Sequence, residues 1–243
     1  MFERYFSEFP WQQLPHNAVG FDVGCGTGRW ARWVAPRVGT LHCVEPSNAM
    51  RVAERNLRDF PACRLQQSTV EEMNIADASC DFGYSLGVLH HIPDTEAGIR
   101  CCVAKLKVGA PFLLYLYYAF DNRPWWFRTI WKMSDAARRA ISNLPFRVRA
   151  LICDVIAAVV YWPLATLARL AERLGLKVDA FPLAAYRGRT FYNMRTDALD
   201  RFGTTLEHRF TRAEVGGMLS RAGLDKIKFR DDWPYWCAVG IKR

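Results

Sequence analysis

Phe21-Asp22-Val23-Gly24-Cys25-Gly26-Thr27-Gly28 is the stretch of sequence that decides the fold. An apolar run, Ala18 to Val23, leads into three alternate glycines, and the residues from Arg29 to Val38 then follow a helical pattern. Glycine is needed where the backbone turns through positive φ and where a ligand must touch the main chain. We therefore expect a strand, a ligand-binding turn and a helix.

The spacing of these glycines indicates the kind of ligand. It is GxGxG, which differs from the GxGxxG of dinucleotide-binding proteins, and the tighter loop suits a ligand without a pyrophosphate, such as S-adenosylmethionine. Glu45 follows the predicted second strand, Thr40 to Val44, and a carboxylate there can accept both hydroxyls of a ribose. The alternative is an exposed acid before a proline turn at Pro46, but the glycine loop upstream favours the ribose contact.

Together these segments resemble the class I S-adenosylmethionine-dependent methyltransferase family, in its small-molecule type. Asp22 to Gly28 is similar to the first motif of the family and Glu45 to the second, while Gln67 to Glu72 falls where the family holds the adenine. Thr69 stands where many members have an aspartate, and Ser85 to Asp94 is similar to the segment after the fourth strand. The resemblance implies S-adenosyl-L-methionine as cofactor and S-adenosyl-L-homocysteine as product. The cofactor-binding residues that it implies are Asp22, Gly24, Cys25, Gly26, Gly28, Glu45, Pro46, Thr69, Val70 and Leu86.

Strand-like and helix-like segments alternate as far as Tyr118, which predicts an α/β protein with a parallel sheet. The resemblance implies a seven-stranded, mostly parallel, Rossmann-like sheet whose last strand is antiparallel, with a helical insertion after strand 5. We assign residues 1–119 and 196–243 to the cofactor-binding core. Residues 120–195 are expected to form several helices that cap the carboxyl ends of the strands.

Methyl transfer asks little of a protein, because the sulfonium already activates the methyl group, and the protein mainly orients the acceptor and excludes water. His90 and His91 are the candidate catalytic residues, since they lie beside the expected methyl position, where one of them could remove a proton. In the alternative interpretation one histidine packs at a helix start and the other hydrogen-bonds backbone. The eight cysteines form no CxxC pair and no Cys/His cluster with zinc spacing, so we expect no metal site.

Three groups of polar and aromatic residues are candidates for contact with the acceptor. Tyr118, Asp121, Asn122 and Arg123 follow the fifth strand, and they suit either a pocket wall or a loop that anchors the insertion. Tyr186, Tyr192 and Arg195 come just before the sheet fold resumes, where they could close over an acceptor from the other side. Tyr5, near the N-terminus, could fold over the cofactor as a lid.

Charge and apolar residues are unevenly distributed. The net charge is +9, and residues 122–177 hold ten Lys or Arg against three Asp or Glu. Such a segment suits an acidic partner or provides solubility. Ala150 to Ala168 is its most apolar part, interrupted by Asp154 and expected to break at Pro163. It fits a buried pair of cap helices, or an interfacial helix whose basic flanks meet an anionic membrane.

The leading hypothesis is methyl transfer to a small-molecule or lipid-like acceptor that binds under the helical cap. One alternative is a nucleic-acid methyltransferase or binder that uses the basic insertion, but the fourth strand is not followed by the NPPY-type tetrad of base-methylating members, so we expect no nucleic-acid partner. The other alternative is a non-catalytic, membrane-associated protein that binds S-adenosylmethionine. The cysteines suit the reduced cytoplasm, and the basic insertion allows a membrane-peripheral location.

Overall fold

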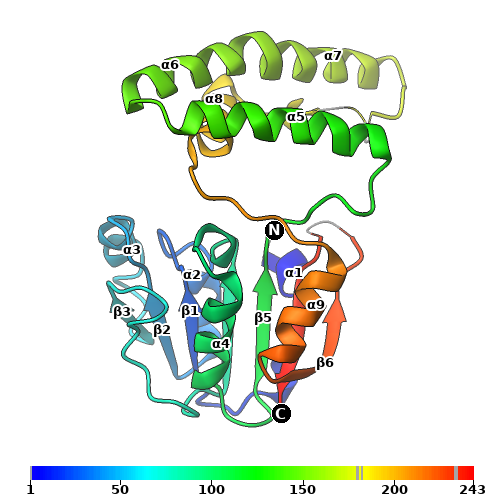
Figure 1. Cartoon of the computed structure of the whole chain (residues 1–243). Coiled ribbons are helices and arrows are strands. Elements are labelled where there is room, and N and C mark those ends of the chain that lie inside the picture. The colour runs from blue at the N-terminus through cyan, green and yellow to red at the C-terminus, as the bar shows by residue number, and fades with distance from the viewer. Residues whose placement is uncertain (1, 179–180, 182, 233–234) are drawn as a thin grey trace. The chain divides into compact units, whose positions relative to one another are not determined.

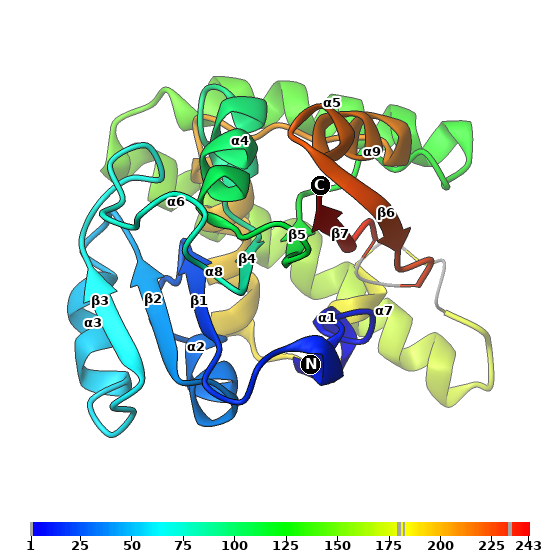
Figure 2. The same ribbon diagram turned by 90° about the horizontal axis from the view of Figure 1, so that it is seen from below.

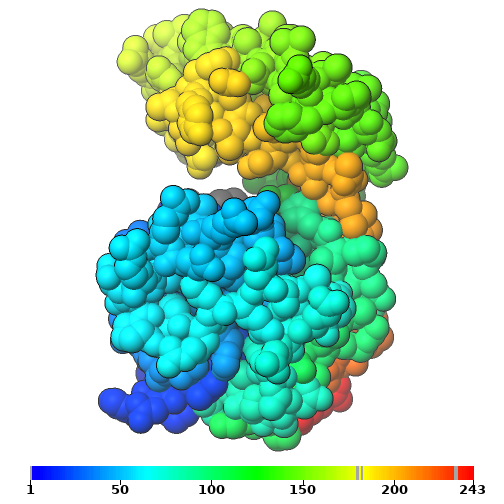
Figure 3. Space-filling model, turned by 90° about the vertical axis from the view of Figure 1, so that its left-hand side faces the viewer, coloured from blue at the N-terminus to red at the C-terminus, as the bar shows by residue number. Residues whose placement is uncertain are grey.

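The computed structural model describes residues 2–178, 181, 183–232 and 235–243. The chain forms two compact units, which we call unit 1 (Met1–Asp121 with Leu206–Arg243) and unit 2 (Asn122–Thr205). Figure 3 shows the side chains of one face, where residues of α3 (Met50–Asn56) and β3 (Cys63–Gln66) form the blue to cyan surface of unit 1.

Unit 1 is built on a seven-stranded sheet with the strand order β3-β2-β1-β4-β5-β7-β6 (Figures 1 and 2). The pairs among β1 to β5 are parallel, whereas β7 runs antiparallel to both β5 and β6. The strands are β1 (Val19–Val23), β2 (Thr40–Val44), β3 (Cys63–Gln66), β4 (Phe82–Leu86), β5 (Pro111–Tyr115), β6 (Leu224–Phe229) and β7 (Ala238–Lys242). The predicted α/β sheet, mostly parallel with an antiparallel last strand and a helical insertion after strand 5, is confirmed.

Two helices of unit 1 begin at residues whose side chains cap them. Asp94 accepts a hydrogen bond from the Ala97 amide at 2.8 Å, and Thr211 and Glu214 form a capping box. The helices of unit 1 are α1 (Phe2–Tyr5), η1 (Trp11–Gln13), α2 (Ala31–Val34) with η2 (Ala35–Arg37), α3 (Met50–Asn56), η3 (Leu89–His91), α4 (Thr95–Lys105) and α9 (Arg212–Arg221).

Aromatic rings lie across β1 and β4, and glycines make room for them. A Cβ on Gly83 would lie 2.1 Å from the ring of Phe21, and a Cβ on Gly20 would lie 2.2 Å from the ring of Phe82. Side chains along a strand point alternately to the two faces of the sheet. Phe21 of β1 and Phe82 of β4 accordingly belong to two different hydrophobic clusters. On the short helix α2, Ala31 and Val34 are buried, whereas Trp33 is 54% exposed.

Unit 2 is helical, and its core lies between the helical segment of residues 146–173 and α8. Its elements are α5 (Trp125–Ser142), α6 (Phe146–Ile156), the π-helical η4 (Ala157–Tyr161), α7 (Trp162–Arg173), η5 (Ala184–Tyr186) and α8 (Phe191–Gly203). Cys153, Ala157 and Tyr161 pack against Met194 and Ala198 of α8. The expected boundary between residues 195 and 196 falls inside α8, so the insertion is corrected to residues 122–205.

Pro163 does not break the apolar segment, contrary to expectation. Helical structure continues from α6 through η4 into α7. A proline ring clashes with the carbonyl four residues earlier, which is Val159 here, and a π-turn widens the backbone at that place. The wider turn also keeps Cys153, Ala157, Tyr161 and Ala165 on one buried face, although their four-residue spacing would drift around a regular α-helix.

Candidate cofactor and acceptor site

The glycine loop opens on one side only. Gly24, Gly26 and Gly28 have φ values of +77°, +55° and +80°, in the left-handed region that favours glycine. A Cβ on Gly24 would lie 2.3 Å from Val88, whereas a Cβ on Gly26 would meet nothing within 4 Å. Gly26 therefore presents bare backbone to open space at the carboxyl end of β1, as a ligand-binding turn requires.

Glu45 braces this loop from the neighbouring strand. Its Oε2 accepts the Gly26 amide and its Oε1 accepts the Ser47 amide, each at 3.0 Å. The side chain is largely buried, and a carboxylate has about four acceptor positions, so the ones left over can take hydroxyl donors. The bracing of Gly26 is a role that the sequence analysis missed; the ribose contact stays a prediction.

Asp22 is buried in β1 beside the loop. It is 1% exposed, and neither carboxylate oxygen has a hydrogen-bond partner within the described part of the chain. Burial raises the pKa of Asp22 to about 8, and the neighbouring Tyr84 hydroxyl offsets part of that rise. A buried acid without a partner is costly on its own, and a cationic ligand group would supply what it lacks.

The other predicted cofactor residues lie at the carboxyl ends of the first four strands of the chain. Cys25 is buried in the loop, Pro46 is exposed after β2, and Leu86 ends β4 nearly buried. After β3, Thr69 is half-buried and Val70 packs in the core. Ser68 lies in the predicted adenine segment but was not among the predicted cofactor-binding residues, and its buried hydroxyl has no hydrogen-bond partner among the residues described. The predicted set thus gathers at one edge of the sheet.

An aromatic wall stands at the same edge of the sheet. Tyr5 packs on Trp30 with a centroid distance of 4.8 Å and meets Tyr115 edge-on at 5.1 Å. Tyr117 continues the wall at 6.3 Å from Tyr115. Burial raises the pKa of Tyr5 to about 12, so its hydroxyl stays protonated at neutral pH. The sequence analysis named only Tyr5 of this wall, because the other rings fall within predicted strand, loop and helix segments.

His90 is part of the packing. It is fully buried, and its ring stacks on Tyr117 at 3.9 Å and lies 4.1 Å from the ring of His91. Burial lowers the pKa of His90 to about 2, which keeps the imidazole neutral. Such a weakly basic group is poorly matched to proton removal at neutral pH.

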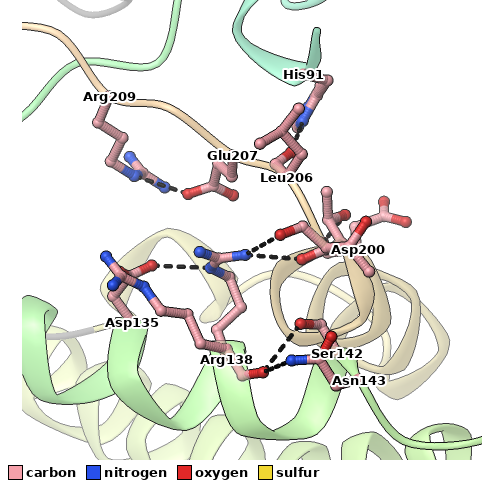
Figure 4. Close-up of polar contacts among 12 residues, drawn as sticks. His91, Asp135, Arg138, Ser142, Asn143, Asp200, Leu206, Glu207 and Arg209 are labelled. Carbon is pink, nitrogen blue, oxygen red and sulfur yellow. Dashed lines mark hydrogen bonds and ion pairs between the residues drawn. The ribbon is translucent and has the colours of Figure 1, made fainter. Parts of the chain in front are cut away.

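His91 is oriented by a backbone carbonyl (Figure 4). Its Nδ1 lies 2.9 Å from the carbonyl oxygen of Leu206. A carbonyl oxygen only accepts, so Nδ1 carries the proton in this contact, and in the neutral ring the lone pair is on Nε2. Of the two predicted histidines, His91 therefore has the arrangement of an oriented base.

Next to His91, an ion pair occupies the segment that returns to the sheet. Arg209 Nε donates to Glu207 Oε1 at 2.9 Å, and their side chains are only 13% and 2% exposed (Figure 4). The guanidinium also lies 5.0 Å from the ring centre of Tyr117. Neither residue could be predicted from the sequence, because nothing local shows that this segment bridges back to Tyr118 through Phe210.

Two of the predicted acceptor residues of unit 1, Asp121 and Tyr118, contact other residues of the same unit. Asp121 accepts the Trp236 indole at 2.8 Å and the Arg212 amide at 3.0 Å, which is the anchoring role. Tyr118 packs on Phe120 with a centroid distance of 4.5 Å.

The remaining predicted residues belong to unit 2. Arg195 makes a two-bond ion pair with Asp154 at 2.6 and 2.8 Å, and Tyr186 packs on Tyr161. Tyr192 is 72% exposed. Contact of these three residues, and of Asn122 and Arg123, with an acceptor stays a prediction.

Residues 21–114 match the family model of a methyltransferase domain. A stretch of 100 residues is 31% identical to Phosphoethanolamine N-methyltransferase 2 of Caenorhabditis elegans; it is 40% of this chain and 23% of that protein. The chain thus spans about a quarter of the length of this curated relative.

Two solved structures show the same fold. The YcgJ protein of Bacillus subtilis aligns with a TM-score of 0.56 and 16% identity, over 96% of this chain and 72% of that one. Phosphoethanolamine N-methyltransferase 2 of Haemonchus contortus, in complex with phosphomonomethylethanolamine and S-adenosylhomocysteine, aligns with a TM-score of 0.54 and 14% identity, over 92% of this chain and 37% of that one.

Proposed function

We propose that this chain, which carries a class I methyltransferase domain, transfers a methyl group from S-adenosylmethionine to a small-molecule or lipid-like acceptor. One observation carries the proposal: the backbone of Gly26 faces open space, and its amide donates to the carboxylate of Glu45. A nearby aromatic wall supplies the water-excluding surface that methyl transfer needs.

The residues at this edge of the sheet fit the cofactor. Gly26 leaves room for a ligand against the backbone, the remaining acceptor positions of Glu45 suit ribose hydroxyls, and buried Asp22 suits the cationic end of the molecule. When bound, S-adenosylmethionine supplies a methyl group already activated by its sulfonium. The chain binds the cofactor, orients the acceptor and keeps water away.

We infer that the acceptor atom is a nitrogen or oxygen whose proton must leave. Nε2 of His91 is the group that takes this proton, because Leu206 fixes the ring through Nδ1. A small amine is the first acceptor to test, since the relative with 31% identity is named for N-methylation of phosphoethanolamine. The tyrosine and tryptophan rings of the wall also suit an amine, which as a cation is attracted to aromatic faces.

The free cysteines support the proposed compartment. All eight are unpaired, and five of them, Cys25, Cys43, Cys80, Cys102 and Cys237, are buried in unit 1. Free thiols persist in a reducing compartment, so we place the reaction in the cytoplasm.

Two measurements test the proposal. Calorimetric titration with S-adenosylmethionine and with S-adenosylhomocysteine is expected to give saturable binding of both. Release of S-adenosylhomocysteine is then followed with phosphoethanolamine, with phosphatidylethanolamine vesicles and with transfer RNA, and turnover is expected with an amine and not with RNA. Failure of the folded protein to bind either ligand would overturn the cofactor assignment. Binding without turnover on any acceptor, including a cell metabolite extract, would favour a non-catalytic role.

A further inference from the structure

One helix of unit 2 is long and apolar enough to cross a membrane, judged by length and composition. It runs over Phe146–Arg173, its mean hydropathy is 1.9, and only 22% of its most apolar window is buried. The exposed apolar residues lie along one side, three or four positions apart except for a step of eight between Val159 and Leu167. They are Val148, Leu151, Val155, Val159, Leu167, Leu170 and, just past the helix end, Leu174, which are 46 to 72% exposed. We call this set the apolar face.

The opposite side of the same helix is committed to the interior of unit 2. Cys153, Ala157 and Ala165 are fully buried in the cluster with α8. Asp154, the acid near the middle of the helix, accepts two hydrogen bonds from Arg195 of α8. One side of the helix is therefore packed and hydrogen-bonded within unit 2, whereas the apolar residues on its other side are exposed.

Basic residues stand at both ends of the apolar face. Arg147 precedes it, Arg173 stands beside its last residue, Leu174, and Lys177 follows it, all exposed. Within the described ranges no ion pair is recorded for these three side chains, whereas Glu172 is paired with Arg187 at 2.9 Å. The face is thus apolar along its length and positively charged at its ends.

We propose that the apolar face is a docking surface for an anionic lipid bilayer, with the helix lying in the plane of the membrane interface. Apolar residues on one side with Lys and Arg at the margins are what such helices use. Trp162, 55% exposed on the flank of the face, suits the headgroup level.

Two other occupants fit the observations less well. A transmembrane helix needs about 20 apolar residues, but the charge-free stretch runs only from Val155 to Ala168 and one side of it is packed on α8. A second copy of the chain would bring the same unpaired Arg147 and Arg173 to the contact, and like charges oppose pairing. An anionic surface satisfies both the apolar residues and the cations.

The test is co-sedimentation of the full chain with vesicles, and it is independent of methyl transfer. Equimolar phosphatidylcholine and phosphatidylglycerol vesicles are compared with phosphatidylcholine alone. Val159→Glu places a charge on the face, and Val108→Glu is the matched control, because Val108 is 78% exposed in a turn of unit 1. Arg147→Gln with Arg173→Gln is compared with Arg51→Gln with Arg55→Gln on α3.

We expect wild type and Val108→Glu to bind the anionic vesicles equally and Val159→Glu to bind about tenfold more weakly. The Arg147/Arg173 variant should also lose about tenfold, while the Arg51/Arg55 variant should bind like wild type, and binding should weaken with salt. Equal binding by Val159→Glu and Val108→Glu would overturn the proposal. So would self-association that Val159→Glu abolishes in the absence of vesicle binding, or vesicle-bound protein that an alkaline carbonate wash fails to release.

Discussion

The amide of Gly26 donates to Oε2 of Glu45 across 3.0 Å, so the end of β2 holds the tip of the loop that follows β1. The other oxygen of the same carboxylate accepts the Ser47 amide. One side chain therefore fixes two turns at the edge where the cofactor is proposed to bind, and its removal should affect both the loop and the ligand.

Glu45→Ala is expected to lower stability and to weaken binding of S-adenosylmethionine by at least about tenfold. Two partly buried amides lose their acceptor, and each such loss costs about 1–3 kcal/mol. Calorimetry measures both quantities, by thermal unfolding and by titration. Glu54→Ala, at an exposed position of α3, is the control and should leave both unchanged. Wild-type affinity in Glu45→Ala would remove Glu45 from the cofactor site.

Gly26→Val should abolish cofactor binding while the protein stays folded. The added side chain would enter the open space beside the loop, where nothing in the chain lies within 4 Å of the Cβ. Gly109→Val is the matched control, since Gly109 has φ +83° and equally open surroundings in a turn before β5. Both variants carry about 1–2 kcal/mol of backbone strain, so similar melting temperatures are expected. Titration should then show binding only for Gly109→Val; binding by both would place the cofactor elsewhere.

Asp22 should make the stability of the ligand-free protein depend on pH. Its pKa is about 8 in the folded chain, against 3.8 ordinarily, because burial disfavours the charge. Between these pH values the folded state binds a proton that the unfolded state has released. The contribution of Asp22 to stability therefore falls as the pH rises from about 4 to 8, by up to about 1.4 kcal/mol per pH unit, and stays constant at higher pH. Asp22→Asn removes this loss, and it should unfold at a higher temperature than wild type at pH 8.

The same carboxyl group should couple cofactor binding to proton release. A sulfonium or ammonium group near Asp22 favours the carboxylate, so the affinity for S-adenosylmethionine should increase as pH rises toward 8. Titrations at pH 7 in buffers with different ionisation enthalpies report the released proton directly. Asp22→Asn and Asp22→Ala should release none, and both should bind more weakly. A wild-type binding enthalpy that is the same in every buffer would contradict this role.

The sheet and the cofactor loop could be predicted from the sequence because their signals are local. Gly24, Gly26 and Gly28 have positive φ, the strands are short apolar runs, and Asp94 and Thr211 cap helices with their own side chains. Each of these features depends on neighbours within a few residues.

The missed features depend on contacts between residues far apart in the chain. His91 is oriented by Leu206, and Glu207 pairs with Arg209 on a segment that pairs with Tyr118 through Phe210. Pro163 was expected to break a helix, because the sequence does not show that a π-turn would absorb the proline. No periodicity marks such long-range placements, so the cofactor edge was easier to predict than the acceptor edge.

Arg138 holds the end of α8 within unit 2, and Arg138→Met should cost about 3–5 kcal/mol of stability. Its Nε pairs with Asp135 at 2.8 Å, and its Nη1 donates to the Thr204 carbonyl at 2.8 Å (Figure 4). Burial alone would raise the pKa of Asp135, but Arg138 and Arg139 outweigh it and hold that pKa below its usual value. Denaturant unfolding of Asp135→Leu with Arg138→Met should recover part of the loss, because no unpaired buried charge remains. An unchanged midpoint in the single variant would show that the pair contributes nothing.

His91→Asn should separate catalysis from cofactor binding. Asparagine places its amide nitrogen where Nδ1 of histidine lies, so it can still donate to the Leu206 carbonyl and the 206–210 segment should stay in place. It has no group at the position of Nε2 that can accept a proton. We expect kcat to fall about a hundredfold, with the affinity for S-adenosylmethionine nearly unchanged. A purely structural role predicts something different: His91→Asn would then keep the wild-type kcat, and only His91→Ala, which loses the bond to Leu206, would be impaired.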